Sequence, residues 1–141
     1  MNAKEYLSQI QNLNGYIGIR CRNHEILKAA AERTTSVLSD MPRPSSRDPH
    51  RGEAKRVAVI DDAYEINELT DKYIDLLREA ADKIYAIEDN NSGMKEVLEM
   101  KYIYNKGWDE IAEEMDLTER HVKRLHGWGL AAMDKIMDDE S

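Results

Sequence analysis

Six polar residues near the C-terminus have side chains of the types that proteins use to contact DNA. They are Thr118, Glu119, Arg120, His121, Lys123 and Arg124. Arginine and lysine donate hydrogen bonds to guanine edges in the major groove or to backbone phosphates. Glu119 could accept from a cytosine amino group or pair with Lys123, which follows four positions later. Such chemistry requires these side chains to share the outer face of one helix.

The residues around this set predict two short helices joined by a tight turn. Ile111, Ala112 and Met115 have the spacing of the inner face of a first helix, and Val122 and Leu125 that of a second. Ala112 suits the contact because helices that cross at a steep angle need a small side chain there.

The turn itself has suitable residues. Asp116 tolerates a left-handed backbone better than most residues, and Thr118 can accept hydrogen bonds from the free N–H groups that begin the next helix. With helices expected at about 94–104, 108–115 and 118–136, the sequence predicts a helix-turn-helix from Met94 to Ile136. The last helix would enter the major groove.

The rest of the chain predicts an all-α protein. Apolar residues alternate in steps of three and four over residues 3–38 and again over 53–88, with Arg20 and His24 as polar interruptions of the first series. All three prolines lie between these stretches, so we expect a loop at about 39–52. The predicted domains are a long antiparallel helical hairpin over residues 1–92 and a three-helix helix-turn-helix unit with an acidic tail over 93–141. Few contacts should cross the break at Asp89–Gly93.

A two-helix hairpin covers only part of its own apolar surface. Six residues are expected to remain incompletely covered: Ile26, Val37, Ile60, Ile74, Leu77 and Ile84. Exposed apolar rows of this kind favour self-association, so we expect a homodimer formed through the hairpin. The opposite, acidic face of the second helix, from Asp61 to Asp82, is expected to be solvated.

Other function classes have little support in the sequence. Cys21 and His24 are only two potential metal ligands on one helix, so we expect no metal and no cofactor. No nucleophile–base arrangement or phosphate-binding glycine loop is evident, and we expect no enzyme and no catalytic residue. Without an apolar span or a signal-peptide pattern, the sequence predicts no membrane association and a cytoplasmic location.

The charge distribution limits where DNA could bind. The formal net charge is −8. Residues 93–141 carry seven Lys and Arg against twelve Asp and Glu. DNA contact must therefore use a local basic face, and the acidic first helix of the motif should be turned away from the duplex.

The segment GWDEIAEEMDLTERHVKRLHGWGLAAMDKI resembles region 4 of sigma-70-type RNA polymerase sigma factors. It is more similar still to small region-4-like proteins of phages and prophages of Gram-positive bacteria, some grouped with ArpU-type late-gene regulators. In that group a W-x-x-I-A-x-x-M/L motif precedes a V-x-R-x-H-G helix. The matching residues are Trp108, Ile111, Ala112, Met115, Val122, Arg124, His126 and Gly127.

This resemblance implies promoter-type double-stranded DNA as the ligand and adds RNA polymerase as a candidate partner. Gly129 departs from the pattern, because it follows Gly127 closely in a helix that the family usually keeps stiff. Sigma regions 1 to 3 have no counterpart in the sequence, so we do not expect promoter opening.

Three hypotheses follow from the sequence. The first is a sequence-specific DNA-binding transcription regulator. The second is a module that binds RNA polymerase without reading DNA. The third is a phage packaging or structural coiled-coil protein, although small terminase subunits commonly place the helix-turn-helix before the oligomerising helices.

Overall fold

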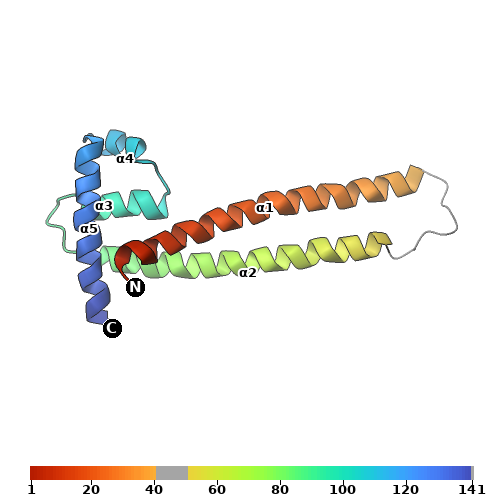
Figure 1. The fold of residues 1–141 in the computed structure, drawn as a ribbon, viewed down its shortest axis with the longest axis horizontal. Helices are drawn as coiled ribbons and strands as arrows, with labels where there is room; N and C mark the ends of the chain where they lie inside the picture. Colours follow the sequence, from red (N-terminus) through yellow and green to blue (C-terminus); the bar gives the residue numbers. More distant parts are fainter. Residues whose placement is uncertain (41–50, 141) are drawn as a thin grey trace. The chain divides into compact units, whose positions relative to one another are not determined.

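The computed structural model describes residues 1–40 and 51–140, and every regular element within them is helical (Figure 1). The elements are α1 (Ala3–Asp40), α2 (Arg51–Tyr85), α3 (Met94–Leu98), a π-helical segment η1 (Glu99–Ile103), α4 (Trp108–Met115) and α5 (Glu119–Glu140). The all-α prediction is confirmed for this part of the chain. Most of the expected proline-containing loop, and the side chain of Val37, lie outside the described residues.

The contacts divide the chain into two compact units. Unit 1 comprises residues 1–13 and 73–141, and unit 2 comprises residues 14–72. This division differs from the expected boundary between residues 92 and 93. None of the helices in the described residues combines the length and apolar character that crossing a membrane requires.

In unit 2, polar residues of α1 pair with carboxylates of α2. Arg20 donates to Asp62 Oδ1 and to Glu65 Oε2, each at 2.8 Å, and His24 Nδ1 lies 2.9 Å from Asp62 Oδ2. Arg20, and after it His24, lowers the pKa of the Asp62 carboxyl below its ordinary value. The polar interruptions predicted at Arg20 and His24 therefore have partners. Asp62 does not belong to a solvated outer face, because only 21% of its side chain is exposed.

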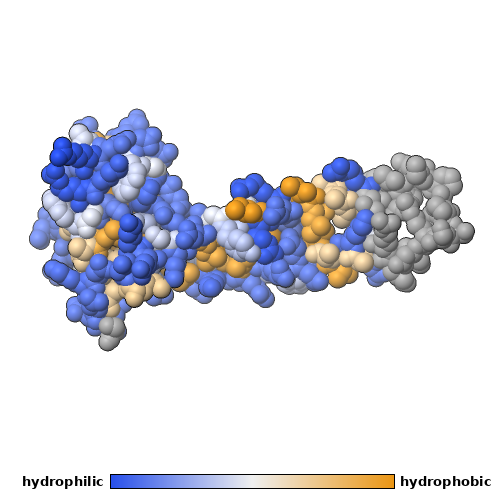
Figure 2. Space-filling view, viewed as in Figure 1, coloured by the Kyte–Doolittle hydropathy of each residue, from blue (hydrophilic) through white to orange (hydrophobic). Residues whose placement is uncertain are grey.

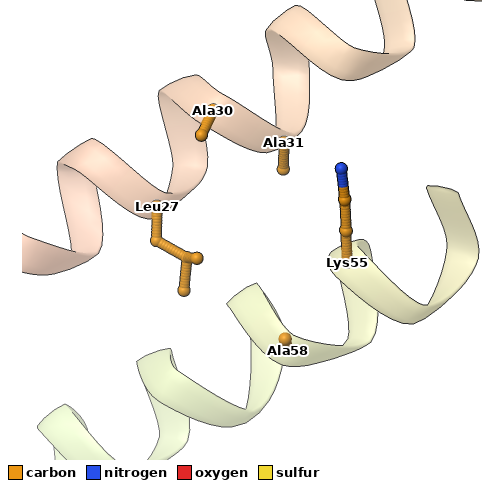
Figure 3. A pocket seen from close by; sticks show the side chains of 5 residues that line it. All are labelled: Leu27, Ala30, Ala31, Lys55 and Ala58. Atoms are coloured by element: carbon orange, nitrogen blue, oxygen red, sulfur yellow. The ribbon is translucent and has the colours of Figure 1, made fainter. Parts of the chain in front are cut away.

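Small side chains leave a shallow apolar groove of about 150 Å³ elsewhere in unit 2. Figure 3 shows Leu27, Ala30 and Ala31 of α1 facing Ala58 of α2, with Lys55 extending from α2 toward α1. Apolar side chains also reach the surface of the two long helices (Figure 2). The large apolar side chains that are exposed in the described part of unit 2 are Tyr16, Ile19, Ile26, Leu27, Val57, Ile60 and Tyr64.

Unit 1 contains an apolar cluster that joins both long helices to the C-terminal elements. Its buried members are Ala3, Tyr6, Leu7 and Ile10 of α1, Ala80 and Ile84 of α2, Ile87, Leu98 of α3, Tyr102 of η1 and Met133 of α5. The Ala3 N–H donates to Asp134 Oδ1 at 2.6 Å, and Lys83 forms an ion pair with Glu140. The expectation of few contacts across Asp89–Gly93 is therefore wrong. The physical reason is that α5 has a second apolar region, from Leu130 to Met137, and the ends of α1 and α2 cover it.

The same cluster corrects the list of incompletely covered residues. Ile84 is fully buried, whereas Ile26 (67%), Ile60 (54%) and Ile74 (42%) are exposed as expected, and Leu77 is half-buried against the cluster. The predicted break is present, because α2 ends at Tyr85 and α3 begins after Gly93, whose φ is +97°.

Candidate nucleic-acid interface

A second apolar cluster holds α4 and α5 together. It buries Val97 of α3, Ile111 and Ala112 of α4, and Val122 and Leu125 of α5. All the inner-face residues predicted for α4 and α5 contribute, with Met115 and Leu117 packed at the edge. Complete burial of Ile111, Val122 and Leu125 fixes which face of α5 is turned inward.

The turn between α4 and α5 adopts the backbone expected from its sequence. Asp116 is left-handed, with φ 55° and ψ 46°. The Asp116 N–H donates to the Glu113 carbonyl at 3.3 Å, and the Leu117 N–H donates to the Ala112 carbonyl at 2.9 Å. This pair of bonds is the Schellman arrangement, which satisfies the last carbonyls of a helix. Asp116 thus takes the position that glycine often occupies.

Thr118 caps α5 as predicted. Its Oγ1 accepts a hydrogen bond from the His121 N–H at 3.2 Å, and α5 begins at the next residue. An N-terminal cap of this kind satisfies one of the free N–H groups of the first turn. The turn and the cap together determine the direction in which α5 follows α4.

The candidate contact residues lie on the outward side of the first turns of α5. Thr118, Glu119, Arg120, Lys123 and Arg124 are exposed, and His121 is half-exposed. None of the three cations forms an ion pair with a carboxylate of the described residues. Glu119 and Lys123 are likewise unpaired with each other, so this cationic face is free to meet an anionic partner.

Gly129 has a packing role that sequence reasoning missed. A Cβ at this position would lie 3.0 Å from Leu98 Cδ1, 3.1 Å from Leu98 Cγ and 3.4 Å from the Met94 carbonyl oxygen. Gly129 is buried, whereas a Cβ at Gly127 would meet nothing within 4 Å. The glycine therefore permits close approach of α5 to α3. A small residue flanked by apolar ones was the only available signal.

An aromatic and polar group connects η1, α4 and α5. His126 Nε2 lies 2.6 Å from the Tyr102 hydroxyl, and the His126 and Tyr102 rings stack with their centroids 5.6 Å apart. Trp108 meets the His126 ring edge-on, with 4.9 Å between centroids. Burial, and then the positive charges of Lys101 and Lys4, lower the pKa of His126 below 6.5. Trp108 thus packs within the unit, while Trp128 is 51% exposed.

Two lysines lie near the Trp108 ring. The Nζ of Lys101 is 4.4 Å and that of Lys123 is 6.0 Å from its centroid. Lys101 was not among the predicted contact residues, because it belongs to η1 and not to α5.

α4 carries the opposite charge. Asp109, Glu110, Glu113 and Glu114 of α4 are exposed. Glu114 forms an ion pair with Lys106. No group of three or more His, Cys, Asp or Glu side chains in the described residues has an arrangement that could hold a metal ion. The charged groups of this region are therefore the cations at the start of α5 and the exposed carboxylates of α4.

Comparison of the chain with protein-family models, curated proteins and solved structures gave no significant match.

Proposed function

We propose that the protein is a sequence-specific DNA-binding transcription regulator that inserts the first turns of α5 into the major groove. The observation that carries the proposal is the row of exposed cations Arg120, Lys123 and Arg124, opposite the buried Val122 and Leu125 and without an ion-pair partner among the described residues. A helix held rigidly by its inner face and presenting cations outward has the properties of a recognition helix. The capped turn adds support, because it fixes the direction in which α5 projects.

The proposal includes an arrangement of domains and partners. α1 and α2 form a long antiparallel hairpin, and α3, η1, α4 and α5 form the helix-turn-helix. Self-association through the hairpin would cover exposed residues such as Ile26, Ile60 and Tyr64. A dimer would present two recognition helices to two half-sites. RNA polymerase is the proposed second partner, on the basis of the sigma region 4 resemblance. Sedimentation equilibrium at high micromolar concentration tests the dimer, and a monomer there would contradict it.

The experiment that tests DNA reading compares three single variants by fluorescence anisotropy. Arg120→Ala, Lys123→Ala and Arg124→Ala are titrated against the best-bound natural fragment and against a scrambled fragment of the same length. A residue with a bidentate contact to guanine should lose about 1–3 kcal/mol on the preferred fragment and discriminate less at that base pair. A residue that contacts only phosphate should lose affinity equally on both fragments.

Lys135→Ala is the matched control, because Lys135 is exposed on the C-terminal half of the same helix. Circular dichroism confirms that each variant is folded. Unchanged affinity in all three test variants would overturn the recognition-helix assignment. The second hypothesis, a module that binds RNA polymerase without reading DNA, would then replace the proposed function.

A further inference from the structure

We propose that Lys101 and Lys123, one on each of two helical elements beside the Trp108 ring, form a binding site for the phosphate backbone of DNA. This inference rests on the proposed function and divides its residues by role. Lys101 and Lys123 would hold the backbone, and Arg120 and Arg124 would remain to read bases.

The geometry places the ammonium groups of Lys101 and Lys123, which belong to η1 and α5, near one indole ring. Each Nζ lies near the centroid of one indole ring, Lys101 at 4.4 Å and Lys123 at 6.0 Å. Their separation cannot exceed the sum of these two distances. The electron-rich face of a tryptophan attracts cations and so partly offsets the repulsion between them. B-DNA carries about one negative charge per 1.7 Å of helix axis, so a pair this close can meet neighbouring phosphates.

Within the part of the chain that the structure describes, neither lysine is paired with a carboxylate. Among the described residues, no carboxylate forms an ion pair with Lys101 or Lys123. Lys106 provides the contrast in the same unit, because its ammonium group is paired with Glu114. The lowered pKa of His126, caused after burial by Lys101 and Lys4, agrees with a positive potential on this side of the unit.

The supporting structure holds the site in place before any ligand binds. Gln11 Nε2 donates to the Lys101 carbonyl at 3.0 Å, which ties the π-helical segment to α1. The next residue, Tyr102, is buried and shares the 2.6 Å hydrogen bond with His126. Trp108 is held against the ring of His126. The π-helical turn, a feature frequent at functional sites, thus places Tyr102 inward and Lys101 beside the indole.

The involvement of Trp108 also explains why Lys123 is assigned to the backbone. Its ammonium group lies toward the beginning of α4, whereas Arg120 and Arg124 make no ring contact or ion pair in the described structure. A lysine offers a point charge suited to phosphate, and an arginine offers a planar fork suited to guanine.

The test measures the salt dependence of DNA binding for Lys101→Gln, Lys123→Gln and the double variant, with Lys135→Gln as control. Each phosphate contact contributes about 0.9 to the slope of log affinity against log salt. We expect each single variant to lower the slope by that amount and the double variant by about twice as much. Between about 50 and 200 mM salt, each lysine then accounts for about a 3.5-fold smaller change in affinity. Losses should be equal on preferred and scrambled fragments.

Lys101→Arg and Lys123→Arg keep the charge and should restore the slope, which separates a lost contact from a disturbed fold. If Lys101→Gln binds with an unchanged slope while Arg120→Ala or Arg124→Ala still weakens binding, this inference is wrong and the proposed function stands. A loss that the arginine variants do not restore would also overturn it. If the unaltered protein binds no DNA even at the lowest salt, both proposals fail.

Discussion

Two glycines in the middle of α5 should respond in opposite directions to the same substitution. Gly127 and Gly129 are two positions apart in one helix, so Ala gains the same intrinsic helix propensity at both sites, about 1 kcal/mol. They differ in what the added methyl group meets. At Gly127 it meets nothing within 4 Å, and at Gly129 it comes within 3.0–3.1 Å of Leu98.

The cost at Gly129 follows from the burial of its neighbour. Leu98 is fully buried in the cluster of unit 1, and the Met94 carbonyl closes the other side at 3.4 Å. The leucine cannot turn away into solvent. Overpacking of this kind typically costs about 1–3 kcal/mol, which exceeds or cancels the gain in propensity. We therefore expect Gly127→Ala to raise the free energy of unfolding by about 0.5–1 kcal/mol and Gly129→Ala to lower it by about 1 kcal/mol.

Urea unfolding followed by circular dichroism measures both variants against the unaltered protein. The midpoints should move in opposite directions at an unchanged slope, since the surface exposed on unfolding is the same. Thermal midpoints should differ in the same sense by a few degrees. If Gly129→Ala stabilises the protein as much as Gly127→Ala, α5 and α3 are not in close contact, and the packing argument is refuted.

Three further predictions concern the turn, the cap and the buried histidine. Asp116→Val should lower the free energy of unfolding by about 1–2 kcal/mol, because a β-branched residue is strained at φ 55°. Asp116→Gly should be tolerated, and urea unfolding compares the two variants. Thr118→Ala should cost about 1 kcal/mol by removing the bond to the His121 N–H, and Thr118→Ser should restore it, again by urea unfolding. The third prediction concerns pH. Burial and nearby lysines lower the pKa of His126, so this side chain binds its proton less readily in the folded protein than in the unfolded chain. The contribution of neutral His126 to the free energy of unfolding is therefore complete above about pH 6.5 and is lost as the pH falls below that value. The urea midpoints at about pH 7.5 and 5.5 should differ less for His126→Gln than for the unaltered protein. Equal differences in the two proteins would contradict this.

The local features of the turn could be predicted because they depend on neighbouring residues. The left-handed backbone needs only a residue that tolerates it, which Asp116 is, and the cap needs only a hydroxyl at Thr118. The inner faces of α4 and α5 follow from helical periodicity, and Ile111, Val122 and Leu125 are buried accordingly. Such signals lie within a few residues of one another and do not depend on the rest of the fold.

The contacts between distant segments could not be predicted in the same way. Ile84 reads as an ordinary position on an amphipathic helix, and only its packing with Leu7, Leu98 and Met133 shows why it is buried. From the sequence alone, Gly129 is a residue that weakens its helix, and only the close approach of Leu98 in the structure shows why a glycine fits there. Periodicity identifies an apolar face, but it does not say which face of another helix will cover it.

The fold also accounts for how an acidic chain leaves several of its cations without a carboxylate partner among the described residues. Several carboxylates of residues 93–141 are engaged within unit 1: Asp134 accepts the Ala3 N–H, Glu140 pairs with Lys83, and Glu114 pairs with Lys106. The cations at the start of α5 and Lys101 have no such partners in the described structure. Since exposed charges act mainly within about 10 Å at ordinary salt, the local balance near Trp108 and Arg120 governs an approaching phosphate more than the total does. In the proposed DNA complex, the cations of this face and the exposed Asp109, Glu110 and Glu119 near them would therefore decide the interaction with phosphate, rather than the net charge of −8.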